Sequence, residues 1–312
     1  MKPSAKKEVS LRKQARAILN AEARAASYFA ILATYHEISE IEDLSTRRQV
    51  LVEWRATMAE CIQMLVDAAG LPCPQVWHAI GNVYNLGIMV RRDAKEAQKW
   101  FSRAAKAGYA KAMVSLALLI SRPRTEKNSR AALKWLFKAA EMGNASSMGF
   151  IGSAYRDGQG VEVNPAEAAK WFMKAVAGGV HSYLVQAGRI YVRQLARYHD
   201  ALDCFMKAAN AGRCDIYLDL AELYDIPNTE LSDPAKAVEW YQKVIASYPT
   251  NGPRAKVALA QHYHAGTGVV RDTQQAELLL EQVLLPERKR VSSDVIKRAE
   301  KLLREINKSK SR

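Results

Sequence analysis

The chain has 312 residues, 49% hydrophobic and 25% charged, so it can bury ample apolar surface. It contains no run of 18 apolar residues and no clear secretory signal, so we expect no membrane span and a cytoplasmic location. The chain has 46 lysine and arginine residues against 32 aspartate and glutamate residues. The resulting net charge of +14 favours association with an acidic protein, a nucleic acid or an acidic membrane surface.

Residues 1–72 are predicted to form a basic N-terminal arm followed by two helices. The arm, residues 1 to about 15, is polar and rich in lysine and arginine. Apolar residues then recur at helical spacing over about 11–36 and 46–69, with an acidic break between them. Because the end of a stacked repeat array must cover its last apolar face, we expect these helices to form a cap or a degenerate repeat.

Over residues 73–285 one pattern of residues recurs six times. Each copy begins with an aliphatic residue, a small residue and, three positions later, usually a tyrosine, which lie on one face of a helix. The triplets are Ile80/Gly81/Tyr84, Leu116/Ala117/Ile120, Ile151/Gly152/Tyr155, Ala187/Gly188/Tyr191, Leu220/Ala221/Tyr224 and Leu259/Ala260/Tyr263. The small residues follow one another at 36, 35, 36, 33 and 39 positions, which is the period of two-helix solenoid repeats.

The second helix of each copy carries an alanine and, three positions later, a large side chain. The pairs are Ala97/Trp100, Ala132/Trp135, Ala168/Trp171, Ala201/Cys204, Ala237/Trp240 and Ala276/Leu279. Seven positions before the large side chain, five copies have a residue suited to capping a helix. These residues are Asp93, Asn128, Asn164, Asp233 and Asp272. We expect the tryptophans and tyrosines to be buried between repeats, and the small residues to let helices approach closely.

Residues 286–312 are predicted to form a C-terminal capping helix and a basic tail. The helix is expected to begin near Ser292 or Ser293 and to end near Asn307, with the tail after it disordered. Its apolar stripe consists of Val295, Ala299, Leu302, Leu303 and Ile306.

The repeated residues resemble the Sel1-like repeat family, from Val76 to Val283. Two copies carry the family's Gly-x-Gly-Val turn, as Gly158-Gln159-Gly160-Val161 and Gly266-Thr267-Gly268-Val269. The family is similar to tetratricopeptide repeat proteins. The resemblance implies an all-α fold, an α/α superhelical solenoid of about six two-helix repeats, which acts as an adaptor between other proteins and implies no reaction.

No residues have the spacing of a catalytic, cofactor or metal site. Cys61, Cys73, Cys204 and Cys214 form no Cys-x-x-Cys pair, which argues against a metal knuckle and favours a reducing compartment. Cys204 takes the place of the repeat tryptophan and is expected to be a buried thiol. The histidines lack a neighbouring nucleophile, and the two glycine turns lack the Gly-Lys-Ser/Thr ending of a phosphate loop. We therefore predict a protein that is not an enzyme and binds no cofactor or metal.

The function predicted is a non-enzymatic adaptor or scaffold that binds a segment of another protein in the concave face of the repeats. By analogy with tetratricopeptide grooves, exposed positions on the first helices are the candidates, although each can equally be an ordinary solvated position. These are Asn82, Asn85, Ser153, Arg156, Arg189, Glu222 and Gln261.

The alternative is that the basic residues bind nucleic acid or another acidic surface. They gather in the N-terminal arm, around Arg122 to Arg130, and from Arg288 to Arg304. They can also serve only to keep the repeats soluble. Nucleic acid is the less favoured ligand, because the aromatic residues occupy expected core positions, where they cannot stack on bases.

Overall fold

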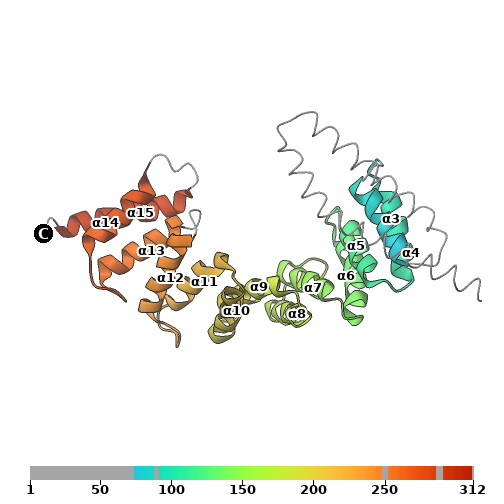
Figure 1. The fold of residues 1–312 in the computed structure, drawn as a ribbon, viewed down its shortest axis with the longest axis horizontal. Helices are drawn as coiled ribbons and strands as arrows, with labels where there is room; N and C mark the ends of the chain where they lie inside the picture. Colours follow the sequence, from blue (N-terminus) through green and yellow to red (C-terminus); the bar gives the residue numbers. More distant parts are fainter. Residues whose placement is uncertain (1–73, 88–90, 248–251, 286–290, 311–312) are drawn as a thin grey trace, which may run out of the picture. The chain divides into compact units, whose positions relative to one another are not determined.

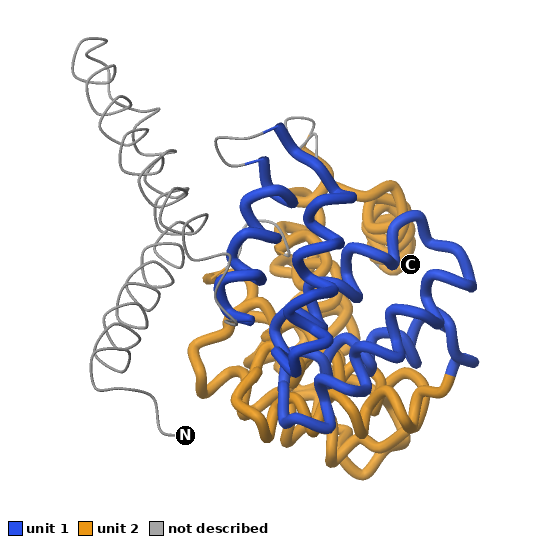
Figure 2. Tube along the Cα trace, turned by 90° about the vertical axis from the view of Figure 1, so that its right-hand side faces the viewer, with its two compact units in different colours: residues 1–163 blue, residues 164–312 orange. Residues whose placement is uncertain are grey.

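The computed structural model describes residues 74–87, 91–247, 252–285 and 291–310, and every regular element in them is helical (Figure 1). Contacts divide the chain into two compact units, residues 1–163 and 164–312, drawn in blue and orange in Figure 2. The prediction of an all-α fold of two-helix repeats is confirmed. The cap predicted in residues 1–72, with Cys61 and Cys73, lies outside the described residues. The division into segments 1–72, 73–285 and 286–312 stays a prediction.

In unit 1 the helices follow one another as predicted, with α3 packed on α4, α4 on α5, α5 on α6 and α6 on α7. Their bounds are α3 (Pro74–Leu86), α4 (Ala94–Lys106), α5 (Ala110–Ile120), α6 (Glu126–Glu141) and α7 (Ala145–Asp157). The first-helix triplets predicted from the sequence lie on α3, α5 and α7, and the alanine/tryptophan pairs lie on α4 and α6.

Unit 2 continues the alternation and ends in a helix outside the repeat series. Its elements are α8 (Pro165–Ala177), η1 (His181–Tyr183), α9 (Leu184–Arg193), α10 (Tyr198–Asn210), η2 (Cys214–Ile216), α11 (Tyr217–Tyr224), α12 (Pro234–Ser247), α13 (Gly252–Ala265), α14 (Thr273–Leu284) and α15 (Ser293–Lys310). Helix pairs α9/α10, α11/α12 and α13/α14 pack closely, and α15 covers α13 and α14.

The predicted apolar stripe of α15 is confirmed, because Val295, Ala299, Leu302 and Ile306 are buried and Leu303 packs partly buried against the same core. The disordered tail predicted after residue 306 is wrong for residues 307–310, since the helix extends to Lys310. Its last turn is supported by a hydrogen bond from Ser309 Oγ to the carbonyl oxygen of Ile306, at 2.7 Å.

The small residues of the first helices do allow the close approach that the sequence predicts. A Cβ added to Gly188 would lie 2.5 Å from Cε1 of Phe205, so α9 meets α10 at a distance that only glycine permits. The turn glycines have a second role: Gly160 has a φ of 76°, and a Cβ there would lie 2.7 Å from the backbone nitrogen of Arg130 at the start of α6. The Gly-x-Gly turn of the third copy therefore docks on the preceding repeat.

Four of the five predicted capping residues cap their helices. Asp93, Asn164 and Asp272 each accept a backbone hydrogen bond at the start of a second helix, and Asp233 accepts one from the backbone of Lys236. The prediction for Asn128 is wrong. Thr125 caps α6 instead, so α6 begins earlier than predicted, and the Asn128 side-chain amide donates to the carbonyl oxygen of Pro123.

The tryptophans are not the core residues that the sequence predicts. Trp100, Trp135, Trp171 and Trp240 are all partly exposed. The residue after each of these four tryptophans is buried instead: Phe101, Leu136, Phe172 and Tyr241. In the other two copies both positions are buried, Cys204 with Phe205 and Leu279 with Leu280. Cys204, in the place of the tryptophan in α10, is buried as expected.

Helix geometry explains the difference. Each residue turns the helix by about 100°, so the side chain three positions after the repeat alanine lies about 60° to one side of it. The buried side chains of α4 after Ala97 are Phe101, Ala104 and Ala105. Phe101 and Ala105 lie on the other side of Ala97, by about 40° and 80°, and Ala104 lies within about 20° of it. The tryptophan therefore sits at the margin of the buried face. There a cation covers it: the Lys174 Nζ lies 4.1 Å from the ring centre of Trp171.

Candidate partner-binding surface

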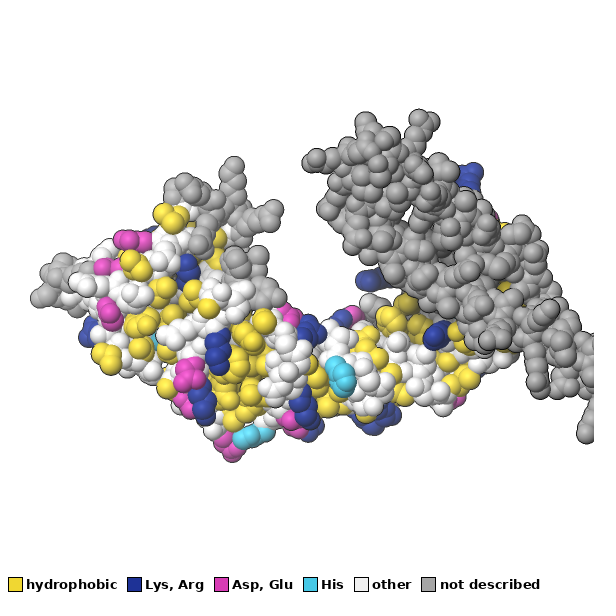
Figure 3. Space-filling view, viewed as in Figure 1, with side chains coloured by type: hydrophobic (Ala, Val, Ile, Leu, Met, Phe, Trp, Pro, Cys, Tyr) yellow, Lys and Arg dark blue, Asp and Glu magenta, His cyan; other side chains and the backbone are white. Residues whose placement is uncertain are grey.

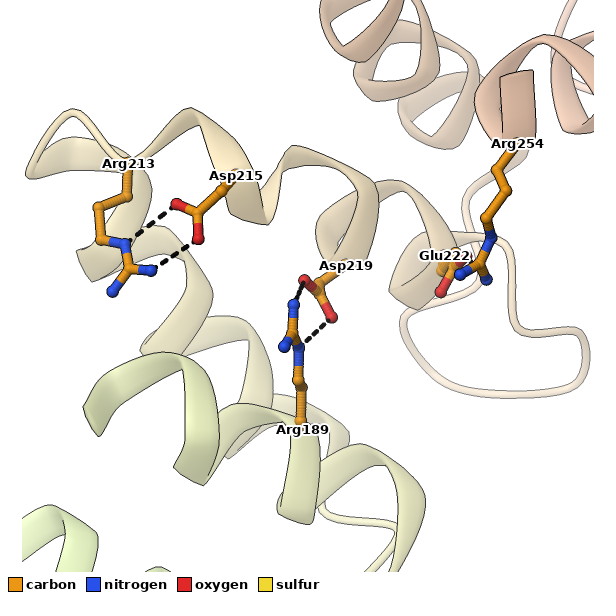
Figure 4. A network of polar contacts seen from close by, with 6 residues as sticks. All are labelled: Arg189, Arg213, Asp215, Asp219, Glu222 and Arg254. Carbon is orange, nitrogen blue, oxygen red and sulfur yellow. Dashed lines mark hydrogen bonds and ion pairs between the residues drawn. The ribbon is translucent and has the colours of Figure 1, made fainter. Parts of the chain in front are cut away.

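Three of the predicted site residues lie on consecutive first helices of unit 2. Arg189 is on α9, Glu222 on α11 and Gln261 on α13; Arg189 and Gln261 are exposed and Glu222 is partly buried. We call the surface formed by the polar side chains of α9, η2, α11 and α13 the first-helix face of unit 2 (Figure 4).

Arg189 forms a bidentate ion pair with Asp219 that joins two repeats. Its Nε and Nη2 donate to the two carboxylate oxygens, both at 2.8 Å. The Asp219 side chain is only 11% exposed, so the pair is partly shielded from water. The hydrogen bond to Asp219 raises the pKa of Arg189 above its already high value, so this cation is permanent. The guanidinium group is thus held in one orientation on the surface.

A second pair joins the next two repeats. Nη2 of Arg254, on α13, donates to Oε1 of Glu222, on α11, at 2.6 Å. Burial raises the pKa of Glu222, and the nearby Arg254 partly offsets this effect. On the same face, Arg213 and Asp215 form a bidentate pair at 3.0 and 2.6 Å. Figure 3 likewise shows acidic and basic side chains of unit 2 next to one another, without a large patch of one sign.

A cleft of about 200 Å³ lies beside the Glu222–Arg254 pair. Its lining comes from α11, α12, α13 and α15, and includes Gln261 near the two charged groups. The lining residues are Glu222, Asp225, Tyr241, Arg254, Val257, Ala258, Gln261, Val295 and Arg298. The capping helix α15 therefore contributes to this surface as well as closing the hydrophobic core.

Beneath this cleft lies a polar network that the sequence analysis missed. The Tyr241 hydroxyl and Nε2 of His262 both lie 3.1 Å from the carboxylate of Asp225. The other ring nitrogen of His262 lies 3.0 Å from the carbonyl oxygen of Thr267, and the histidine is only 4% exposed. Nδ1 also lies 2.9 Å from the Thr267 hydroxyl, which can donate or accept, so the protonated imidazolium can donate from both ring nitrogens. The sequence did contain a hint of this network, because the other five copies have an apolar residue at the position of His262.

This network predicts a pH dependence of stability. Burial alone lowers the pKa of His262, but the hydrogen bond and the charge of Asp225 outweigh it and raise the pKa above its usual value near 6.5. A raised pKa in the folded state stabilises the protein fully below about pH 6.5, and this contribution is lost as the pH rises through the folded-state pKa. We expect the free energy of unfolding, from urea titrations, to fall over that range in the natural protein. His262→Leu places an apolar residue there, as in the other repeats, and should remove this pH-dependent part of the stability. If the variant kept the pH profile of the natural protein, His262 would not be its source.

The four candidates in unit 1 are less closely grouped. Asn82 and Asn85 are partly buried on α3, and Ser153 and Arg156 are partly buried on α7. The Ser153 hydroxyl donates to the carbonyl oxygen of Gly149, within its own helix. Arg156 pairs with the adjacent Asp157 at 2.7 and 2.9 Å, and this hydrogen bonding lowers the pKa of Asp157.

The geometry provides little for catalysis. Within residues 74–87, 91–247, 252–285 and 291–310, no group of three or more His, Cys, Asp or Glu side chains is placed to hold a metal ion. Burial raises the pKa of the Cys204 thiol to about 11, which keeps it protonated and unreactive at neutral pH. His78 has its pKa lowered to about 4, first by burial and then by Lys111. In the same part of the chain, no helix is both long and apolar enough to span a bilayer.

The comparisons with known proteins identify the repeats. The model of the Sel1 repeat matches residues 78–109, 110–144, 145–180, 218–245 and 253–282, which together are more than half of the chain. The chain belongs to the Sel1 repeat family. The predicted fourth copy is not matched, yet α9 and α10 form a helix pair like the others, with Gly188 against Phe205. Sel1 repeats generally form non-catalytic scaffolds for protein–protein interaction.

Solved structures of other Sel1 repeat proteins share the fold. A protective antigen of uropathogenic Escherichia coli strains that displays an SLR fold is 28% identical, with a TM-score of 0.56 over 71% of this chain and 48% of that chain. This chain thus spans about half the length of that protein. A Sel1 repeat protein from Oxalobacter formigenes is 24% identical, with a TM-score of 0.52 over 77% of this chain and 96% of that chain. No curated protein matches the sequence.

Proposed function

We propose that this Sel1 repeat protein is a non-enzymatic adaptor, and that the first-helix face of unit 2 binds a segment of a partner protein. The observation that carries the proposal is the cleft beside the Glu222–Arg254 pair, where two repeats and α15 present polar groups around a small opening. Family membership supports a protein as the partner, and its identity is left to experiment.

The size of the cleft favours a protein partner over a small molecule. Pockets for small ligands usually measure about 300 to 1,000 Å³, whereas this one measures about 200 Å³. That volume suits one side chain of a peptide that continues along the surface. Because Arg189 and Arg254 are already held by Asp219 and Glu222, little side-chain entropy is lost when they meet a partner.

We propose a second binding surface on the first helices of unit 1, made of the remaining candidates Asn82, Asn85, Ser153 and Arg156. It has weaker support, because the interactions of Ser153 and Arg156 described above lie within their own helix. We further propose a cytoplasmic location, which the free thiols of Cys204 and Cys214 support.

The test is affinity capture from the cytosolic fraction of the native cell, followed by binding measurements with the captured partner. Gln261→Trp places a bulky side chain at the cleft, and we expect it to weaken binding at least tenfold, as is typical of hot-spot changes. Gln242→Trp, at an exposed position on the second helix α12, is the matched control and should bind normally.

Equal affinity of the two variants for the partner would contradict the assignment of the first-helix face. Recovery of the native protein from a membrane or extracellular fraction would contradict the proposed compartment.

A further inference from the structure

Much of the positive charge of the chain lies in the described part of unit 1, which includes one of the three predicted clusters, Arg122 to Arg130. Residues 74–163 contain 14 Lys and Arg against 6 Asp and Glu, a net charge of +8 out of the chain's +14. Residues 164–312 are longer and carry 22 against 17, a net charge of +5. Unit 1 therefore has the stronger attraction for a polyanion.

Most of this charge lies on the second helices α4 and α6, both of which pack on α5. We call their exposed basic residues the α4/α6 basic face. It consists of Lys95, Lys99, Arg103, Lys106, Lys127, Arg130, Lys134 and Lys138, all exposed. On each helix they recur every three or four residues, so they form a row about 16 Å long.

Few acidic groups neutralise these rows. Glu96 pairs with Lys99, and Glu126 pairs with Arg130 at 2.8 Å; Glu141 is the remaining acidic residue of the two helices. Among the described residues, Lys95, Lys106, Lys127 and Lys134 have no ion pair with a carboxylate. Their charges are thus available to a ligand, in contrast to the paired arginines on the first-helix face of unit 2.

Aromatic side chains lie between the charges. Trp100 and Trp135 are partly exposed at the margin of the core. The Lys138 ammonium lies 5.0 Å from the Trp135 ring, and the Arg103 guanidinium lies 5.7 Å from the Trp100 ring but 4.0 Å from that of Trp77. Nucleic acid was the less favoured ligand because the aromatic rings were expected to be buried. Since Trp100 and Trp135 are partly exposed, that objection no longer holds. A cation over an exposed ring contributes about 0.5 to 1 kcal/mol, and a stacked base contributes about 1 to 3 kcal/mol. A base can therefore displace the cation, which then meets a phosphate.

The same face is poorly suited to a lipid bilayer. Large apolar side chains that are exposed in the described part of unit 1 are Leu86, Leu118, Met142 and Val163, none of which lies within α4 or α6. A surface that binds membranes strongly adds apolar insertion to its charge, whereas basic residues with interleaved aromatic rings are typical of single-strand binding.

We propose that the α4/α6 basic face binds single-stranded nucleic acid without sequence selection. The lysines and arginines contact phosphates, and Trp100 and Trp135 stack on bases. This activity is separate from the adaptor function of unit 2, and either can be absent without affecting the other.

The test uses the full chain and a fluorescent deoxythymidine oligomer long enough to cover both helices, with anisotropy measured over a range of salt concentrations. One variant changes Lys95, Lys106, Lys127 and Lys134 to Gln. For a single strand, each lost phosphate contact lowers the salt slope by about 0.7, or affinity about fivefold near 0.1 M salt. We therefore expect a slope lower by about 3 and an affinity several hundredfold weaker.

The matched control changes Lys170, Lys174, Lys236 and Lys243 to Gln, which removes the same charge from second helices of unit 2 that carry the same tryptophan–lysine contacts. It should bind within about threefold of the natural protein. Trp100→Leu with Trp135→Leu should weaken binding at least tenfold while leaving the salt slope unchanged, because stacking releases no counterions.

Three outcomes would overturn the proposal. One is no binding of the oligomer at low salt, and another is equal loss in the two lysine variants, which would indicate a general charge effect. The third is binding to phosphatidylserine vesicles, lost in the first variant, with oligomer binding unchanged; the face would then belong to a membrane contact.

Discussion

Phe172→Ala is expected to lower the free energy of unfolding by about 3 to 5 kcal/mol, whereas Trp171→Ala is expected to lower it by about 1 to 2 kcal/mol. Phe172 is fully buried in α8 and stacks on Tyr183, with the ring centres 5.2 Å apart. Its removal leaves a cavity that the surrounding helices cannot fill. Trp171 is larger, but it lies at the margin of the core. Its replacement by alanine therefore removes only a partly buried side chain and the contact with Lys174.

The two variants are compared by urea denaturation at a single protein concentration, with circular dichroism as the measure of unfolding. Each variant acts as the control for the other, because the two positions are adjacent on the same helix. Because repeats are stabilised by their neighbours, the effect of Phe172→Ala should reach beyond α8 and lower the overall helicity at intermediate urea. A larger loss from Trp171→Ala than from Phe172→Ala would show that the tryptophan is the core residue after all.

The repeat could be predicted from the sequence because its strongest constraints are local. Aliphatic residues followed by glycine or alanine, such as Ile80 and Gly81, mark the inner side of each first helix, and caps such as Asn164 mark the start of each second helix. The error at the tryptophans came from taking the large side chain three positions after the repeat alanine, such as Trp171, as the buried one, when the next residue, Phe172, is buried. Ala168 and Ala175 lie about midway between the two rings, whereas Ala169, which is also buried, lies on the side of Phe172.

The surface contacts were less predictable, because they join residues that the sequence separates. Arg189 was a candidate, but its partner Asp219 lies 30 residues away on another repeat. Asp225 and His262 meet because α11 and α13 are neighbours in the stack, and no spacing in the sequence indicates this. The α4/α6 basic face was predicted only in part: Lys127 and Arg130 belong to the cluster around Arg122 to Arg130, whereas its other lysines are spread at helical spacing along α4 and α6 and form no run of charge.

Gly188→Ala is expected to lower the free energy of unfolding by about 1 to 3 kcal/mol, the usual effect of overpacking a core. In an open helix the same change would stabilise the protein by up to about 1 kcal/mol, because alanine has the higher helix propensity. At Gly188 the new methyl group would lie within 3.0 Å of three atoms of the Phe205 ring, which is itself only 1% exposed. The ring cannot move away without disturbing α10, so the steric effect outweighs the propensity.

Two further variants test this explanation by thermal and urea denaturation. Gly252→Ala, at the first residue of helix α13, has nothing within 4 Å of the added methyl group apart from its chain neighbours, so it should lower stability much less than Gly188→Ala. Phe205→Leu makes room for the methyl group, so the double variant with Gly188→Ala should be more stable than the sum of the single effects by about 1 kcal/mol or more. Strict additivity of the two changes would mean that Gly188 is needed for some reason other than its contact with Phe205.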